Sequence, residues 1–236
     1  MSGWAAKRFW KQAQVRAVDG GYAIMLDERQ VRTPAKALMV VPSAGLAAAI
    51  AAEWEAQQGK IDPRSMPFTR SANAAIDKVG PQRAEVVDLL AAYGDADLIC
   101  YRAVGPAELV ARQAAAWDPL IDWAATALDV PLITAAGVMH IPQAPQSLRR
   151  LAECVAEFDP FALTAFHDLV AISGSLIIGL AATREFSPVE ALWSQSRIDE
   201  DWQSEVWGSD EEADAAAALK REAFVHAGKL FRICQG

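Results

Sequence analysis

The sequence has few cysteines and histidines, and neither kind is clustered. The three cysteines, Cys100, Cys154 and Cys234, lie far apart, and no CxxC pair occurs. The three histidines share no metal-ligand spacing with one another or with a cysteine. The sequence therefore indicates neither a disulfide framework nor a zinc site, and a reducing compartment fits it best.

The sequence also lacks an apolar run that could cross a membrane. The uncharged stretch Leu169–Thr183 has 15 residues, whereas a bilayer-spanning helix needs about 20 apolar residues. We therefore expect this stretch to form a buried helix. The first ten residues contain no apolar leader segment, so we expect a cytoplasmic protein with no membrane insertion.

No catalytic motif is present. The chain contains no phosphate-binding loop and no dinucleotide fingerprint, and Ser173 and Ser175 lie in ISGSL rather than in a GxSxG elbow. His167 is followed by Asp168, but no other His/Asp constellation accompanies them. The sequence thus predicts no catalytic residue, no metal and no cofactor. A small hydrolase with an unrecognised carboxylate site stays open as an alternative.

Positive charge is scarce. The 236 residues carry 22 Lys and Arg against 30 Asp and Glu, for a net charge of −8. Nucleic acids and anionic membranes bind basic surfaces, so this balance argues against both as partners. A hydrophobic fraction of 53% is typical of a globular chain that buries a core.

The hydrophobic pattern changes along the chain. Residues 7–41 alternate and contain turn signals, which predicts a β-meander. Ser43 is placed to cap a helix over residues 44–57. After Gly80-Pro81 the period becomes 3.6 and stays there. We therefore predict an α+β fold, with a mixed β-meander and helix domain over residues 1–79 and an all-α domain over residues 80–236.

Three polar residues recur at helical spacing before this change. Arg70, Asn73 and Asp77 fall on one face of a helix that starts near Phe68, because Pro63 and Pro67 exclude an earlier start. A binding site and an internal hydrogen-bond network both fit such a row. We expect the network, with all three side chains buried. Trp54, which shares a four-residue row with Leu46 and Ile50, is expected to be a core residue.

The most distinctive stretch is Ser187–Asp214. Apolar residues at three- and four-residue steps predict one helix from Ser187-Pro188 to Gly208, and a second helix opening at Asp210. Between Glu185 and Asp214 there are ten carboxylates and a single base, Arg197, which gives a local charge of −9. Such a face is either simply solvated or binds a basic partner. The predicted partner-binding residues are Glu205, Trp207, Asp210, Glu211, Glu212 and Asp214. A core position for Trp207 stays open.

Several stretches, in the same order along the chain, resemble one protein family. They are KRFWKQAQV, YAIMLDERQVRTPAK, AAEWEAQQGKIDPRSMPFTRSANAAID, DADLICYRA, QAAAWDPLIDWA and SRIDEDWQSEVWG. MPFTRSANAAID and DWQSEVWG are the most specific of them. With these stretches the chain is similar to the assembly chaperones of the ATP synthase F₁ sector that handle its α subunit.

The resemblance implies a two-domain protein without cofactor or turnover. Such a chaperone binds the unassembled α subunit and protects it from aggregation until a β subunit takes its place. The resemblance also implies that Glu211, with Asp210 and Glu212 beside it, belongs to the functional surface. Almost nothing precedes KRFWKQ, so the expected relative is a bacterial-type, cytoplasmic member, and we expect a monomer. An acidic adaptor for another protein partner is the alternative.

Overall fold

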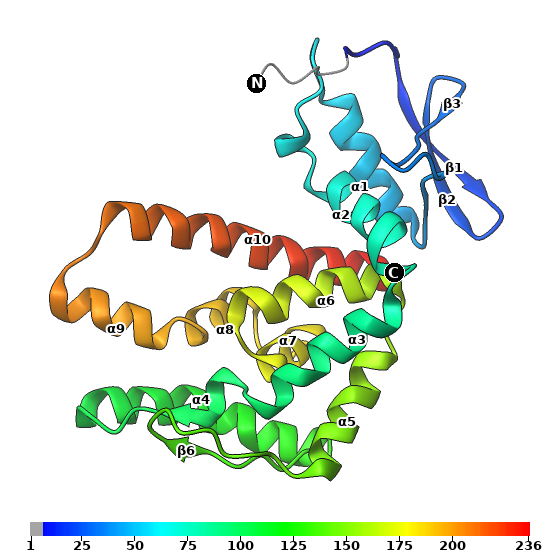
Figure 1. The fold of residues 1–236 in the computed structure, drawn as a ribbon. Coiled ribbons are helices and arrows are strands. Elements are labelled where there is room, and N and C mark those ends of the chain that lie inside the picture. The colour runs from blue at the N-terminus through cyan, green and yellow to red at the C-terminus, as the bar shows by residue number, and fades with distance from the viewer. Residues whose placement is uncertain (1–6) are drawn as a thin grey trace. The chain divides into compact units, whose positions relative to one another are not determined.

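The computed structural model describes residues 7–236, and these fall into two compact units. Figure 1 follows the chain from the strands near its beginning through a series of helices to its C-terminus. The first unit runs to Arg83 and also includes Asp159–Ala165 and Lys229–Gly236. The second consists of Ala84–Phe158 and Phe166–Gly228. Neither unit is one continuous stretch of the sequence, and the division into domains of residues 1–79 and 80–236 stays a prediction.

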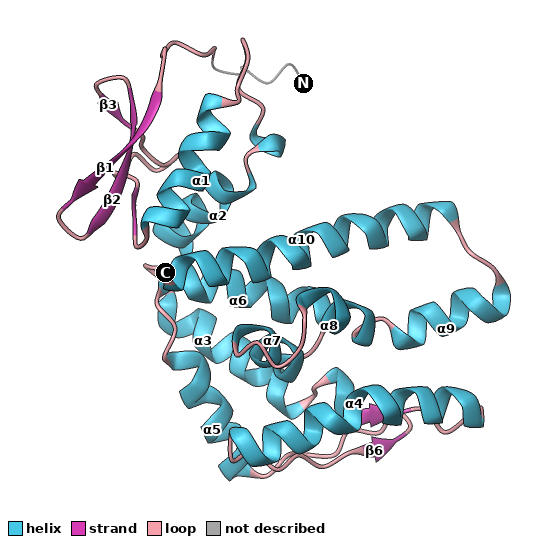
Figure 2. Cartoon of the chain, turned by 180° about the vertical axis from the view of Figure 1, so that it is seen from behind, coloured by secondary structure: helices cyan, strands magenta, loops and turns pink. Residues whose placement is uncertain are grey.

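The first unit contains a four-stranded sheet with β2 at its centre (Figure 2). Its strands are β1 (Ala13–Val18), β2 (Gly21–Leu26), β3 (Arg29–Gln30) and β4 (Val40–Val41). Asp19 and Gly20 turn the chain between β1 and β2, and Gly20 has a φ of 81°, which glycine adopts without strain. β4 pairs with β2 rather than with β3, so the sheet differs from the expected simple meander. The tight loop Thr33–Ala37 allows this because the chain folds back before β4 begins.

The helices of the first unit are α1 (Ala44–Glu55) and α2 (Pro67–Ala74). The Ser43 hydroxyl accepts the backbone N–H of Leu46, which confirms the predicted cap. Glu53 of α1 accepts the backbone N–H groups of Phe68 and Thr69 at 2.7 and 2.8 Å, so α1 supplies the cap of α2. Burial raises the pKa of this carboxyl. Trp54 is half-buried and packs edge-to-face on Trp10.

The polar row on α2 is less buried than predicted. Arg70 is exposed, and Asn73 and Asp77 are half-buried. Asp77 accepts the backbone N–H of Ala35 at 3.1 Å, so it does tie the helix to a neighbouring loop. The helix widens into a π-helical turn over Ala75–Val79. A wider turn changes the angle between successive residues, and the expected single face is therefore lost.

The second unit is almost entirely helical. Its helices are α3 (Arg83–Ala91), α4 (Ala107–Ala127), α5 (Pro145–Ala156), α6 (Pro160–Ser173), α7 (Leu176–Thr183), α8 (Val189–Gln195), α9 (Ile198–Trp207) and α10 (Glu211–Gln235), of which α3, α6 and α10 also contribute residues to the first unit. Two short strands, β5 (Tyr101–Arg102) and β6 (Ala135–Ala136), pair in parallel. With the sheet of the first unit, this confirms the predicted α+β class. None of the helices in residues 7–236 is long and apolar enough to span a bilayer.

The uncharged run Leu169–Thr183 is buried but is not one helix. Gly174 has a φ of 72° and ends α6, and the Ser175 hydroxyl accepts the N–H of Ile178 to start α7. The carboxylate of Asp97 forms hydrogen bonds near this junction between α6 and α7. Its two oxygens accept the N–H groups of Ile99 and Ile177 at 3.2 and 3.0 Å, and the residue is completely buried.

The predicted single helix from Ser187 to Gly208 is also two helices. The indole N–H of the fully buried Trp117 donates to the carbonyl of Gln195 at 2.8 Å. In a continuous helix that carbonyl would accept the N–H of Asp199. Because the indole takes it instead, α8 stops at Gln195 and α9 begins at Ile198. Pro188 precedes α8 rather than opening it.

Candidate partner-binding site

The predicted partner-binding residues lie where α9 and α10 meet. Gly208, with a φ of 93°, ends α9 directly after Trp207, as the sequence indicated. Asp210 then caps α10, and its carboxylate accepts the N–H groups of Glu212 and Ala213 at 2.8 and 3.0 Å. We call residues 207–214 the acidic corner. Its side chains therefore stand on a defined turn between two helices.

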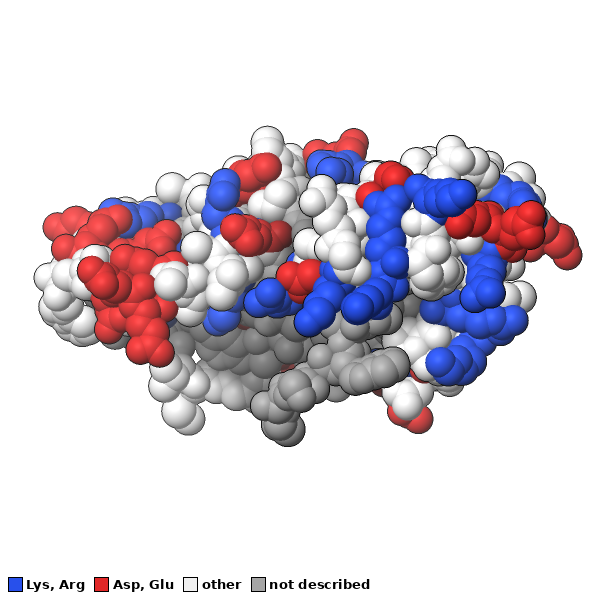
Figure 3. All heavy atoms as spheres, turned by 90° about the horizontal axis from the view of Figure 1, so that it is seen from above, with Lys and Arg blue, Asp and Glu red and all other residues white. Residues whose placement is uncertain are grey.

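Trp207 is a surface residue. Its exposed fraction is 83%, which excludes the core position that the sequence had left open. Its neighbour Val206 is 53% exposed. Exposed tryptophan is uncommon outside contact surfaces, because it leaves a large apolar area in water. Around Trp207, Asp210, Glu211, Glu212 and Asp214 are also exposed. Figure 3 shows acidic side chains gathered in a dense cluster on one part of the surface.

The carboxylates of this region differ in what they contact. Glu205 forms a two-pronged ion pair with Arg112 of α4, with both N–O distances at 2.8 Å. The hydrogen bonds from Arg112 hold the pKa of the Glu205 carboxyl below its usual value. Glu200 is paired with Arg197 at 2.9 Å. Among the described residues no ion pair engages Glu211, Glu212 or Asp214. Glu205 is therefore the least available of the six predicted contacts.

Contacts with α4 fix the position of α9. The Gln113 amide is buried, donates to Asp199 at 2.6 Å and accepts the N–H of Ala103 at 2.8 Å. The Arg112 guanidinium also lies 5.0 Å from the centre of the Trp202 ring, a cation–π distance. These bonds join α9, α4 and the segment after β5. The acidic corner is thus presented by a supported helix.

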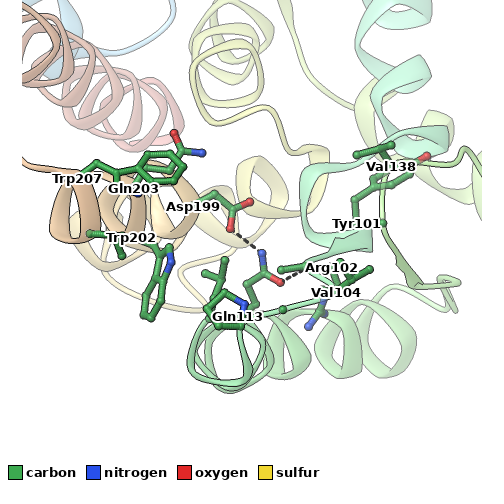
Figure 4. Close-up of a pocket in the computed structure, with 15 residues that line it drawn as sticks. Tyr101, Arg102, Val104, Gln113, Val138, Asp199, Trp202, Gln203 and Trp207 are labelled. Carbon is green, nitrogen blue, oxygen red and sulfur yellow. Dashed lines mark hydrogen bonds between the residues drawn. The ribbon is translucent and has the colours of Figure 1, made fainter.

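A groove beside the corner was not predicted from the sequence. It has a volume of about 490 Å³ and lies between α9, the start of α4, the segment after β5 and the segment after β6. Figure 4 shows Trp202 and Trp207 on one side of it and Val104 and Val138 on the other, with the Gln113–Asp199 hydrogen bond between them. Val104 and Val138 are 82% and 94% exposed. Both lie in irregular segments, where no periodicity could have marked them.

A second hollow, of about 450 Å³, lies between α9 and α10. Trp207 lines both hollows and so forms a ridge between them. Asp210 and Lys220 also line this second hollow. Within residues 7–236 no group of three or more histidine, cysteine or acidic side chains could hold a metal ion. The region therefore offers an exposed apolar ridge beside negative charge, a combination that occurs at protein–protein contacts.

Comparisons with known proteins point to one family. The sequence profile of the ATP12 chaperone protein family matches residues 7–125. The crystal structure of Atp12 from Paracoccus denitrificans is 49% identical, with a TM-score of 0.95 over 97% of this chain and 98% of that one. A protein of Agrobacterium tumefaciens is 38% identical, with a TM-score of 0.90 over 96% and 85%. The mitochondrial Atp12 protein of Schizosaccharomyces pombe is 24% identical over 88% of this chain and 75% of its own length.

Proposed function

The chain belongs to the ATP12 chaperone family, and on that premise we propose that it protects the unassembled α subunit of the ATP synthase F₁ sector until β joins it. The family is one of assembly chaperones for ATP synthase and not of enzymes. The choice of the α subunit rests on the resemblance of MPFTRSANAAID and DWQSEVWG to the chaperones that handle α. We also infer that the protein acts in the cytoplasm as a monomer.

The observation that carries the proposal is the acidic corner. Trp207 is 83% exposed, and three neighbouring carboxylates have no ion-pair partner among the described residues. We take a subunit released from its hexamer to expose an apolar and partly basic interface. Tryptophan is the residue type most often found at the energetic centre of a protein contact. Complementary charge increases the rate of encounter and disfavours wrong partners.

The supported geometry of the corner favours recognition of a folded surface. Asp210 fixes the first turn of α10, so Glu211 and Glu212 start from a defined helix and not from a loose loop. Carboxylates held in this way can form short, charge-assisted hydrogen bonds with arginine or lysine of a partner. The backbone that carries these side chains is already ordered before the partner binds, which lowers the entropic cost of the contact.

The test uses purified F₁ subunits and light scattering. An equimolar amount of the chaperone should suppress aggregation of denatured α on dilution, and it should leave aggregation of β unchanged. Trp207→Ala should weaken binding to α by roughly 30-fold, the effect of losing an interface anchor worth about 2 kcal/mol. Leu219→Ala is the matched control, because Leu219 is 68% exposed on α10 but lies outside the corner.

Two results would contradict the proposal. One is equal protection of α and β, which would indicate a chaperone without preference for α. The other is no binding of α together with retention of a different basic protein, which would favour the acidic adaptor.

A further inference from the structure

We propose that the groove beside the acidic corner is a second contact, which binds an extended apolar segment of the client carrying a lysine or arginine next to its apolar side chains. This inference rests on the proposed function, since it takes the α subunit as the client. It adds a site, formed by Val104, Val138, Val206 and the floor at Leu109, to the charge contact at the corner.

The first support is the exposed apolar surface on both sides of the groove. Val104 and Val138 on one side and Val206 and Trp207 on the other are each more than half exposed. All four line the same groove of about 490 Å³. Binding pockets range from about 300 to 1,000 Å³, so the groove is large enough to take side chains of a partner. Contiguous apolar surface of this kind marks an interaction site.

The second support is that the groove is preformed. Gln113 holds the segment after β5 through Ala103 and holds α9 through Asp199. The backbone N–H of Gly137 donates to the carbonyl of Arg102 at 2.8 Å, which fixes the segment that carries Val138. Each side of the groove is therefore tied to the rest of the unit by hydrogen bonds. A partner segment would find its site already shaped, which reduces the cost of binding.

The third support is the charge around the groove. Two of its lining residues are charged, Arg102 and Asp199. The guanidinium of Arg102 donates to the carbonyl of Ile99 and forms an ion pair with Asp118, both at 2.8 Å, while its Nη2 is buried and does not reach the groove surface. Asp199 accepts a hydrogen bond from the neutral Gln113 amide, and no ion pair engages it among residues 7–236. Trp207, at the edge of the groove, is also the first residue of the acidic corner. The negative charge around the groove favours an apolar occupant that carries a basic residue and disfavours one that carries an acidic residue.

The first experiment measures the affinity of the purified α subunit for groove variants by fluorescence anisotropy. The double variant Val104→Asn with Val138→Asn keeps both sites uncharged and alters only exposed side chains. It should bind α about tenfold more weakly or worse, as expected when apolar anchors are lost. Leu89→Asn is the matched control, because Leu89 is 56% exposed on α3 and does not line the groove. The control should bind α as the wild type does.

The second experiment tests the chemistry of the occupant with synthetic peptides. Two peptides share one apolar sequence and differ only in a lysine or a glutamate beside it. The wild type should prefer the lysine peptide, and Asp199→Asn should lose most of that preference, since Asn keeps the acceptor for Gln113 and removes the charge. A photo-crosslinker placed at position 138 should label a segment of α that is apolar and basic.

The outcomes separate this inference from the proposed function. If the groove variant binds α like the wild type while Trp207→Ala does not, the groove is not a contact and the proposed function stands. If the wild type prefers the glutamate peptide, the proposed occupant is wrong. If the wild type does not bind α at all, the proposed function fails, and this inference fails with it.

Discussion

Two carboxylates near helix N-termini in the second unit, Asp97 and Glu211, have opposite surroundings. Asp97 is completely buried and accepts two backbone N–H groups, one of them from the first turn of α7. Glu211 is exposed in the first turn of α10, and within the described residues no ion pair engages it. Both positions suit a negative charge. Burial, rather than residue type, makes Asp97 part of the fold and leaves Glu211 free for a partner.

The largest expected effect on stability comes from Asp97→Ala. The substitution leaves the N–H groups of Ile99 and Ile177 buried without an acceptor. We expect a loss of about 4 kcal/mol in the free energy of unfolding, since each orphaned group costs roughly 1–3 kcal/mol. Urea denaturation followed by circular dichroism measures it. Asp88→Ala, on the exposed face of α3, is the control and should change stability little. A loss no larger than that of the control would show that Asp97 is not structural.

The next effect is a pH dependence carried by the same carboxyl. Burial raises the pKa of Asp97 from 3.8 to about 6 in the folded protein. Between pH 3.8 and about pH 6, Asp97 is protonated in the folded chain but has lost its proton in the unfolded chain. The contribution of Asp97 to stability is therefore fully present below pH 3.8 and is lost as the pH rises through 6.

The measurement is the difference in unfolding free energy between the wild type and Asp97→Asn from pH 4 to 7. Other carboxylates are common to both proteins and cancel. The difference should fall by roughly 2–3 kcal/mol as the pH rises, because a tenfold change in a proton-binding constant corresponds to about 1.4 kcal/mol. A difference that grows with pH would mean that hydrogen bonding outweighs burial and lowers this pKa.

A smaller effect is expected at the cap of the acidic corner. Asp210→Ala removes the acceptor for the N–H groups of Glu212 and Ala213. Loss of a helix cap costs about 1 kcal/mol, and calorimetry should show a correspondingly small fall in Tm. Asp210→Asn keeps an acceptor at the same position and should restore most of the loss. Equal destabilisation by both substitutions would attribute the effect to charge instead of capping.

The sequence predicted those parts of the molecule that depend on local signals. Ser43 and Gly208 mark a helix start and a helix end through their own chemistry, and both predictions are confirmed. The high density of acidic residues before Asp214 can likewise be recognised from the sequence alone. Local patterns also gave the α+β class, because the change of period at Gly80-Pro81 is a property of neighbouring residues.

The parts that failed depend on contacts between distant residues. The break between α8 and α9 arises because Trp117 takes the carbonyl of Gln195, 78 positions further along the chain. No pattern within residues 187–208 shows this. The groove brings together Val104, Val138 and Val206 from three separate segments. The row of polar residues on α2 was also not one buried face: a π-helical turn over Ala75–Val79 changes the spacing between Asn73 and Asp77, and regular periodicity assumes a constant one.

The stability effect of Glu211→Lys should be the smallest of the series. Glu211 is exposed, and its place in the first turn of α10 is worth about 0.3–1 kcal/mol. The variant should stay folded, with a Tm only slightly below that of the wild type. Its effect on binding should be much larger, because reversing one charge of a desolvated pair costs on the order of 2–5 kcal/mol.

Protection of the α subunit by Glu211→Lys is therefore the most direct test of the account. Light scattering of denatured α on dilution is compared for the wild type, Glu211→Lys and Glu200→Lys. Glu200 lies in the same acidic stretch but is already paired with Arg197. We predict that Glu211→Lys loses protection while it remains folded, and that Glu200→Lys retains most of it. Equal protection by the wild type and a folded Glu211→Lys would contradict the assignment of the acidic corner as the contact surface.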